Sequence, residues 1–405
     1  MIRVAFLTTL TKEHLDLGMG VRTFKFAVYL HKLTKFQIDL WNTIPLPKQE
    51  CEYLHDRARK HGIGFYCTSV QSYINTEKIF STLGVFPRLL SIPHTTATFL
   101  KELKEYDYVW IFQPVPQHSS LPFIKMLYNV KNNSFPILIL DWPMDYSNIG
   151  PNVVTFLYRY LLANSVKAIT VPNKELVDQV RTYARITSNN IYILPHGIDT
   201  SVFKPLPNHY AKTRIGIDDK FVILRMGSYS RMPIKPLIPL IKKLSHTIKN
   251  ILLLSIGGTL SQVEEARRLV RVYDTHDLIR VEGIIPEEEL QYYIASSDVC
   301  LFYDIMTKRK DFPTKILYFM AMKKPIVALK TDGIKETLKG ISILVPTINE
   351  FYEAIMRIYR NPDEVREISE KAYLEARKYD WNNVVKKFLF ILSNVRMRVK
   401  HYENI

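Results

Sequence analysis

Residues 310–329, KDFPTKILYFMAMKKPIVAL, combine groups that can bind a phosphorylated ligand with the elements needed to position them. Asp311 and Thr314 offer capping oxygens on either side of Pro313, and apolar residues then recur at helical spacing. This pattern predicts a helix that starts at about Pro313. A helix N-terminus beside a loop, at the carboxyl end of a strand, is a ready anion site.

The other end of this helix is also marked in the sequence. Lys323 and Lys324 stand where cations are favoured at a helix C-terminus, and Pro325 predicts the stop. A buried strand over residues 326–329 follows.

Glycine is scarce, with 14 glycines among 405 residues, against an average use of about 7%. The glycines that remain are therefore expected where the backbone needs positive φ or approaches a ligand closely. Several fall where a predicted strand gives way to a loop: Gly18, Gly20, Gly197, Gly227, Gly257, Gly258, Gly283 and Gly333.

The chain alternates short apolar runs with helical patterns, which predicts α/β domains with parallel, doubly wound sheets. The proline-rich run FKPLPN at residues 203–208 interrupts this alternation, so we expect domains of residues 1–204 and 205–380. Residues 381–405 are expected to form a C-terminal helix that crosses back to the first domain. Predicted strands cover residues 4–8, 37–41, 64–66, 108–112, 137–140, 168–171 and 191–194, then 222–226, 251–256, 279–282, 299–303, 326–329 and 341–345.

Composition is ordinary for a soluble globular protein, with 47% hydrophobic and 23% charged residues. The formal net charge of +16 attracts anions, but no helix-turn-helix, RNA-binding or zinc motif is present, so no nucleic-acid partner is expected. No run approaches ~20 apolar residues, so membrane contact would be peripheral. Cys51, Cys67 and Cys300 lack metal-ligand spacing, and a reducing cytoplasm is the simplest inference.

Four segments carry motifs in a fixed order. They are LDLGMGVRTFKFAVYL at residues 15–30, ILPHGIDTSVFKP at 193–205, VEGIIPEEELQYYIASSDVC at 281–300 and KKPIVALKTDGIKE at 323–336. Together they resemble the retaining glycosyltransferases of family 4 (glycosyltransferase group 1) over nearly the whole chain. The resemblance implies the GT-B fold, with two facing Rossmann-like domains and an inter-domain cleft.

The resemblance also implies an activity. It is that of a hexosyltransferase that uses a nucleotide diphosphate sugar as donor substrate, needs no cofactor, and acts with retention of configuration on a lipid, glycan or protein acceptor. Because negative charge develops on the leaving diphosphate, catalysis would be mostly electrostatic. Arg231 and Lys235 are the cations of the loop MGSYSRMPIK, where the family usually has an Arg and a Lys, and we assign both to the diphosphate. The alternative is that both are merely exposed at a helix start.

Main-chain groups would supply most of the donor contacts. Amides near Gly20 would meet the phosphate, and the turn from Gly283 to Ile285 would hold the base. Because main-chain contacts leave no trace in the sequence, the identity of the base is not predicted. Lys315 would be an extra cation at the donor or would face solvent. The expected donor-binding residues are Gly20, Gly227, Gly283, Ile285, Asp311, Phe312, Thr314, Lys315 and Tyr318.

Lys310 and Tyr318 stand where the family has the two glutamates of its Glu-x7-Glu element, which usually contact the transferred sugar and the ribose. Tyr318 would stack on or hydrogen-bond the ribose, or pack into the core, and Asp311 would take over the sugar contact. This replacement motivates the alternative of a non-catalytic GT-B protein that binds a nucleotide sugar or a partner. A sugar-nucleotide 2-epimerase shares the fold but should carry more carboxylates.

Asp141, in LILDWPMD, is the third predicted catalytic residue. It would polarise an acceptor hydroxyl as a base, or cap the turn. His196 is expected to be a hydrogen-bonding hinge residue.

Metal binding is not expected, because no DxD pair lies in a strand-end loop and the histidines are scattered. Residues 80–90, FSTLGVFPRLL, would suit docking on anionic lipid at the inner face of a membrane, or form a buried helix.

Overall fold

The computed structural model describes residues 1–12, 18–44, 46–67, 69–70, 102–112, 136–144, 153–185, 190–305, 310 and 312–403. The chain divides into two compact units, Met1–His196 with Trp381–Ile405, and Gly197–Asp380. Ile198 and Phe203 are buried in the core of the second unit. The boundary expected at residue 204 therefore falls inside that unit.

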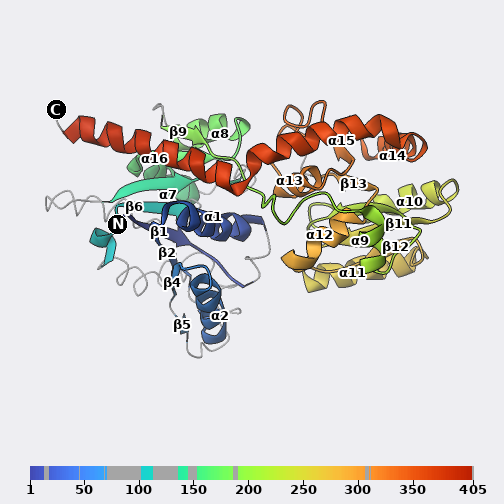
Figure 1. Ribbon diagram of the computed structural model, residues 1–405, viewed down its shortest axis with the longest axis horizontal. Helices are drawn as coiled ribbons and strands as arrows, with labels where there is room; N and C mark the ends of the chain where they lie inside the picture. Colours follow the sequence, from blue (N-terminus) through green and yellow to red (C-terminus); the bar gives the residue numbers. More distant parts are fainter. Residues whose placement is uncertain are drawn as a thin grey trace. The chain divides into compact units, whose positions relative to one another are not determined.

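The first unit is built on a seven-stranded parallel sheet of order β4-β2-β1-β6-β7-β8-β9 (Figure 1). Alternate residues of the interior strand β1 face opposite cores, with Val4 and Phe6 in one and Ala5 and Leu7 in the other. The strands are β1 (Arg3–Thr8), β2 (Gln37–Asn42), β4 (Gly64–Tyr66), β6 (Tyr108–Phe112), β7 (Ile137–Asp141), β8 (Ala168–Val171) and β9 (Ile191–Ile193), and β3 (Leu46–Pro47) pairs separately with β5 (Ser69–Val70).

Helices cover both faces of this sheet. Buried residues of α1 (Gly18–Thr34), α2 (Lys48–Arg59) and α16 (Trp381–Glu403) share one core, and those of α7 (Val153–Ser165) and α8 (Glu175–Ala184) share the other. A short 3₁₀ helix, η2 (Leu103–Glu105), precedes β6.

The C-terminal helix completes the first core. α16 lies beside α1 (Figure 1), and the Phe388 ring lies 5.0 Å from that of Phe26 and 4.8 Å from that of Trp110. The last helix of the chain thus buries its apolar side against elements from the start of the chain.

The second unit has a six-stranded parallel sheet of order β12-β11-β10-β13-β14-β15. Its strands are β10 (Phe221–Met226), β11 (Ile251–Ile256), β12 (Ile279–Val281), β13 (Val299–Phe302), β14 (Ile326–Leu329) and β15 (Ile343–Val345). Its helices are α9 (Asn208–Arg214), α10 (Leu237–Ser245), α11 (Leu260–Val272), α12 (Glu287–Ala295), α13 (Thr314–Ala321), α14 (Phe351–Arg360) and α15 (Pro362–Ala376), with 3₁₀ turns η4 (Ile348–Glu350) and η5 (Arg377–Tyr379).

The ends of α13 differ from expectation. Its N-cap is Pro313, with no side-chain capping bond, so Thr314 is the first helical residue rather than the cap. The helix ends at Ala321, and Lys324 turns into the protein, where its ammonium donates to the carbonyl oxygens of Ala295 and Ser297. Lys324 therefore binds a neighbouring loop instead of the end of its own helix.

Candidate functional site

The topological switch point of the second sheet lies between β10 and β13. The chain leaves β10 towards β11 and β12 on one side, and returns to β13 on the other side of β10. In open α/β sheets, ligands bind in the crevice at the carboxyl ends of strands that flank such a point. The loop that follows β10, residues 227–235, is therefore the natural place for a ligand in this unit.

Arg225, the fifth residue of β10, fixes this loop through hydrogen bonds to its main-chain carbonyls. Its side chain is fully buried, and it donates to the carbonyl oxygens of Met232 at 3.0 Å, Ser228 at 2.7 Å and Gly227. Burial lowers the pKa of this guanidinium, and among the described residues no carboxylate forms an ion pair with it. Main-chain carbonyls thus replace a counter-ion, and they fix the path of the loop.

Two further side chains fasten the same loop. Gln262, in the first turn of α11, accepts hydrogen bonds from Ser228 Oγ at 3.2 Å and from the Tyr229 amide at 3.3 Å. Tyr303, directly after β13, donates its hydroxyl hydrogen to the Pro233 carbonyl. Sequence reasoning did not find Arg225, Gln262 or Tyr303, although a lone Arg inside an apolar strand is a visible irregularity.

Gly227 and Lys315 come together at the switch point. Gly227 has φ +138°, and a Cβ built on it would lie 2.3 Å from the Lys315 ammonium. Lys315, from the first turn of α13, also reaches Met232 Sδ at 3.3 Å. A side chain at position 227 would displace this ammonium, so the glycine allows a cation from α13 to approach the loop after β10.

Arg231 forms an ion pair with Asp304, which follows β13. The Asp304 side chain is 5% exposed and that of Arg231 is 32% exposed. The pair joins the two loops that flank the switch point. Lys235, just before α10, is exposed. Asp304 was not among the predicted residues, although its place directly after a buried strand was a usable signal.

The remaining predicted donor residues differ in where their side chains point. The Phe312 ring stacks on that of Tyr379 at 6.3 Å, and the Tyr318 ring meets Phe203 edge-on at 4.6 Å. Both rings pack within the second core, so the geometry favours the core-packing alternative for Tyr318. Asp311 lies outside the described residues, as do residues 80–90.

Gly283 and Ile285 follow β12, next to the carboxyl end of β11. The Gly283 carbonyl accepts a hydrogen bond from the Gly257 amide at 2.8 Å, and a Cβ at Gly283 would meet only Val263, at 3.9 Å. Ile285 is half-buried against the second core. Their role in holding a base stays a prediction.

In the first unit, Asp141 is fully buried in a polar cluster. Its two carboxylate oxygens accept hydrogen bonds from Arg22 Nε and Nη2, each at 2.9 Å, and from Thr170 Oγ1 at 2.6 Å. Arg22 also donates to the Pro195 carbonyl at 2.7 Å. With both oxygens engaged, the geometry favours the structural role for Asp141 over that of a base. Gly20 is buried in the first turn of α1.

His196 is the last residue of the first segment of this unit and is 4% exposed. Burial, with a smaller effect from the charge of Arg22, holds the pKa of its imidazole well below the ordinary value. The ring is therefore neutral at pH 7, which fits a structural residue better than an acid catalyst.

Comparison with known proteins decides what this fold is. Residues 220–361 match the family model of the glycosyl transferases group 1. The second unit contains a glycosyltransferase group 1 domain. No protein of curated function matches the sequence.

Solved structures resemble nearly the whole chain. HepE of Anabaena in complex with UDP has a TM-score of 0.72 at 13% identity, covering 97% of this chain and 100% of that chain. Sucrose-phosphate synthase of Thermosynechococcus elongatus has a TM-score of 0.72 at 16% identity, with coverages of 98% and 100%. WaaG, a glycosyltransferase involved in lipopolysaccharide biosynthesis, has 0.63 at 14%, with coverages of 95% and 98%. These likenesses show the fold, so the expected GT-B fold is confirmed.

The described part of the chain was also searched for metal-binding groups and for membrane-spanning helices. No group of three or more His, Cys, Asp or Glu side chains there is arranged to hold a metal ion. No described helix is long and apolar enough to span a membrane.

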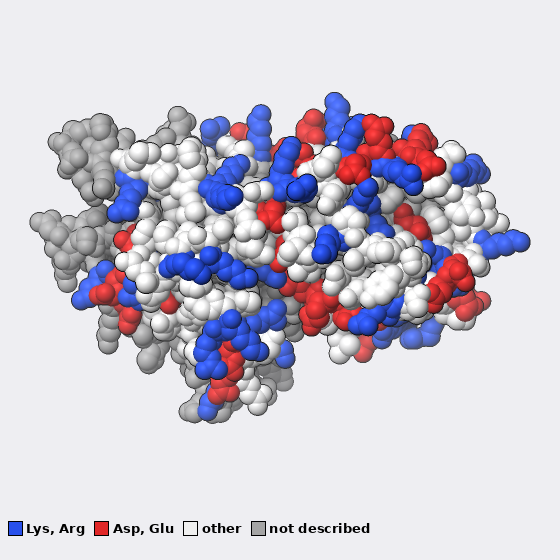
Figure 2. All heavy atoms as spheres, viewed as in Figure 1, with Lys and Arg blue, Asp and Glu red and all other residues white. Residues whose placement is uncertain are grey.

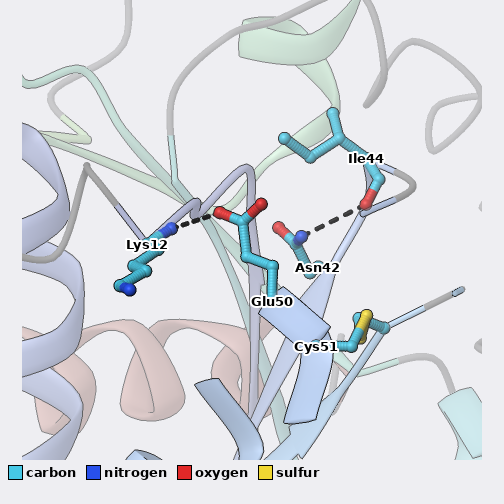
Figure 3. The surroundings of a disulfide bond; sticks show 6 residues. Lys12, Asn42, Ile44, Glu50 and Cys51 are labelled. Atoms are coloured by element: carbon cyan, nitrogen blue, oxygen red, sulfur yellow. Dashed lines mark hydrogen bonds between the residues drawn. A yellow bond between two sulfur atoms is a disulfide. The ribbon is translucent and has the colours of Figure 1, made fainter. Parts of the chain in front are cut away.

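The first unit, by contrast, contains a disulfide. Cys51 on α2 and Cys67 just after β4 are bonded, with Cα atoms 6.2 Å apart (Figure 3). Beside it, the Lys12 amide donates to Glu50, and Asn42 Nδ2 donates to the Ile44 carbonyl at 3.1 Å. The cysteine spacing did not predict this pairing, because spacing carries no information on which segments meet in space.

Proposed function

We propose that this protein is a glycosyltransferase that moves a hexose from a nucleotide diphosphate sugar to a lipid, glycan or protein acceptor. The observation that carries the proposal is the approach of the Lys315 ammonium to Gly227 at the switch point of a glycosyltransferase group 1 domain. A cation that lies against Gly227 in the loop after β10, at the switch point of the sheet, fits a diphosphate.

The chemistry follows from where charge develops. As the bond between the sugar and the diphosphate lengthens, the leaving group gains negative charge, and preorganised positive groups lower the free energy of that state. Lys315 and the amides at the N-terminus of α13 would supply this field, with Arg231 at the rim. Because Arg225, Gln262 and Tyr303 fix the loop in advance, little reorganisation is needed at the moment of reaction.

We further propose retention of configuration, a metal-independent mechanism, and a cytoplasmic protein with peripheral contact to the inner membrane face. In that reducing compartment the Cys51–Cys67 bond would be open and both thiols free. Support for these comes from the family resemblance. Adding a chelator to the transfer assay tests metal independence, since the rate should stay the same. A rate that is lost with EDTA and restored by Mg²⁺ or Mn²⁺ would contradict it.

The alternative function is a non-catalytic GT-B protein that binds a nucleotide sugar or a partner. Lys310 and Tyr318 favour it, because they occupy the positions of the two usual glutamates and Tyr318 packs against Phe203. Binding without turnover would identify this alternative.

The deciding experiment measures release of free nucleotide from a panel of UDP-, GDP- and ADP-sugars, with and without a lipid or glycan extract. UDP-sugars come first, because HepE was solved with UDP and with UDP-glucose. Calorimetric titration of the same donors measures binding separately. Turnover with any donor supports the proposal, and the absence of both binding and turnover across the panel would refute it.

A further inference from the structure

The side of α16 that faces away from the first core carries exposed apolar residues among cations. Phe390 is 66% exposed and Met397 is 62% exposed. They are seven positions apart in the sequence, so they lie about two helical turns apart on one face. The outer face of α16 consists of Asn383, Lys386, Lys387, Phe390, Ser393 and Met397, all of them exposed.

The opposite side of the helix explains why this face is available. Trp381, Val385, Phe388 and Ile391 are each at most 2% exposed, in the core that α16 shares with α1. These residues fix the helix on the first unit. Phe390 and Met397 therefore contribute nothing to that core, yet they keep large apolar side chains in water.

Charge on this helix has one sign. From Trp381 to Tyr402 the sequence contains no Asp or Glu, and its cations are Lys386, Lys387, Arg396, Arg398 and Lys400. None of the described carboxylates forms an ion pair with Lys386 or Lys387, whereas α15 pairs its own charges, as between Lys371 and Glu367. In Figure 2 the surface over α16 carries blue side chains separated by uncharged atoms.

The neighbouring helix α1 also combines aromatic, apolar and cationic side chains. The Tyr29 ring stacks on that of Trp381 at 6.2 Å, and the Lys32 ammonium lies 5.4 Å from the Tyr29 ring. Leu33, one residue on, is also exposed. Apolar and cationic groups thus continue from α16 onto its neighbour.

We propose that the outer face of α16 docks on an anionic lipid bilayer. The helix would lie parallel to the surface, with Phe390 and Met397 in the boundary between headgroups and acyl chains and Lys386 and Lys387 at lipid phosphates. Charge selects this occupant over a second copy of the chain, because a twofold contact would bring the same cations against each other. This interaction goes beyond the transfer reaction and does not depend on it.

The test is sedimentation of the full-length protein with vesicles of phosphatidylcholine, alone or with about 30% phosphatidylglycerol. Binding is expected with phosphatidylglycerol and should weaken as salt is raised. Phe390→Ser/Met397→Ser and Lys386→Glu/Lys387→Glu should each lower the partition coefficient by about tenfold or more.

Matched controls come from the second unit. Leu374→Ser removes an exposed leucine of α15, and Lys242→Glu/Lys249→Glu reverses two exposed cations around α10. Both should keep wild-type partitioning, and circular dichroism should be unchanged in all variants.

Three outcomes would overturn the proposal. They are no binding of the wild type to anionic vesicles, equal binding by the α16 variants, or a dimer in light scattering that Phe390→Ser/Met397→Ser dissociates. No nucleotide sugar is present in this assay, so its failure leaves the transfer reaction untouched.

Discussion

Lys315 and Arg231 are both cations at the switch point of the second sheet, but their surroundings differ. Arg231 already pairs with Asp304, a carboxylate that is almost fully buried. This ion pair partly neutralises the positive charge of the guanidinium before a ligand binds. The Lys315 ammonium lies at Gly227 and Met232 Sδ, against a loop whose carbonyls are drawn towards Arg225. Both cations therefore lie at the loop where the proposed diphosphate would bind.

Lys315→Met should lower turnover of the nucleotide sugar by a factor on the order of 100, because it removes one preorganised positive group. Release of nucleotide under saturating donor measures this. Lys330→Met, which removes an exposed lysine after β14, should leave the rate unchanged. Wild-type turnover in Lys315→Met would exclude the assigned role.

Arg231→Ala should lower turnover by a factor on the order of 100 if its guanidinium meets the diphosphate. It should also destabilise the fold, since Asp304 would keep a buried charge without this partner. Arg231→Ala/Asp304→Ala should recover thermal stability while turnover stays low. Recovery of both in the double variant would mean that Arg231 serves only to neutralise Asp304.

Lys235→Ala is also expected to lower turnover by a factor on the order of 100, because the family resemblance assigns Lys235 to the diphosphate as well.

Among the elements, the loop after β10 shows most clearly what local sequence can and cannot predict. The strand, the glycine and the helix that follows were predictable from alternation and from glycine scarcity. Arg225 was not, because a charge inside an apolar strand has no local partner. Its partners, such as Met232 and Ile256, come from the turn and from the neighbouring strand, and only the fold brings them together.

Arg225→Lys should destabilise the second unit by about 3 kcal/mol or more, since the shorter, single-headed side chain leaves buried carbonyls without donors. Donor KM should rise as the loop loses its fixed path. Urea unfolding and nucleotide-release kinetics measure the two effects. An unchanged KM in a destabilised variant would make Arg225 a purely structural residue.

Lys324, between α13 and β14, makes the free energy of unfolding depend on pH. Burial lowers the pKa of its ammonium to about 8, from 10.5. Below pH 8 the folded state must hold a buried charge, and between pH 8 and 10.5 the unfolded chain binds more protons, so stability rises with pH. Relative to Lys324→Met, the wild type should gain about 2 kcal/mol of unfolding free energy between pH 7 and pH 10.

Comparing wild type and variant cancels the contribution of buried tyrosines such as Tyr303, whose raised pKa opposes the gain above pH 10. Parallel pH profiles for the two proteins would show that Lys324 does not titrate in this range. The lysine illustrates a limit of sequence reasoning, because its position predicted a helix-end charge and the fold buried it against Ala295 and Ser297 instead.

For the whole molecule, alternation of strands and helices was enough to predict two doubly wound units, because parallel sheets buried on both faces need that pattern. The pattern could not show where the units divide. Proline-rich composition pointed to residues 203–208, but Phe203 packs on Tyr318, and this contact ties the segment to the second core. Nor could it show that Cys51 meets Cys67, since that pairing depends on how α2 lies against β4.

The membership of α16 in the first unit yields a prediction about the whole chain. Ending the chain at Asp380 removes seven buried apolar side chains from the first core, namely Trp381, Val384, Val385, Phe388, Ile391, Leu392 and Val395. At about 1.5–3 kcal/mol each, the loss is on the order of 10 kcal/mol, as large as the entire stability of a typical domain.

The truncated chain should therefore lose the fold of its first unit and keep that of its second. Hydrogen exchange followed by mass spectrometry should show lost protection in β1, β2 and β6, with β10 to β14 still protected. Ending the chain after Met397 is the control, because Val395 is the last buried position among the side chains that the structure describes, and both units should stay protected. Protection that persists in β1 after truncation at Asp380 would mean that the first sheet folds without α16. Loss in β10 as well would mean that the two units unfold as one.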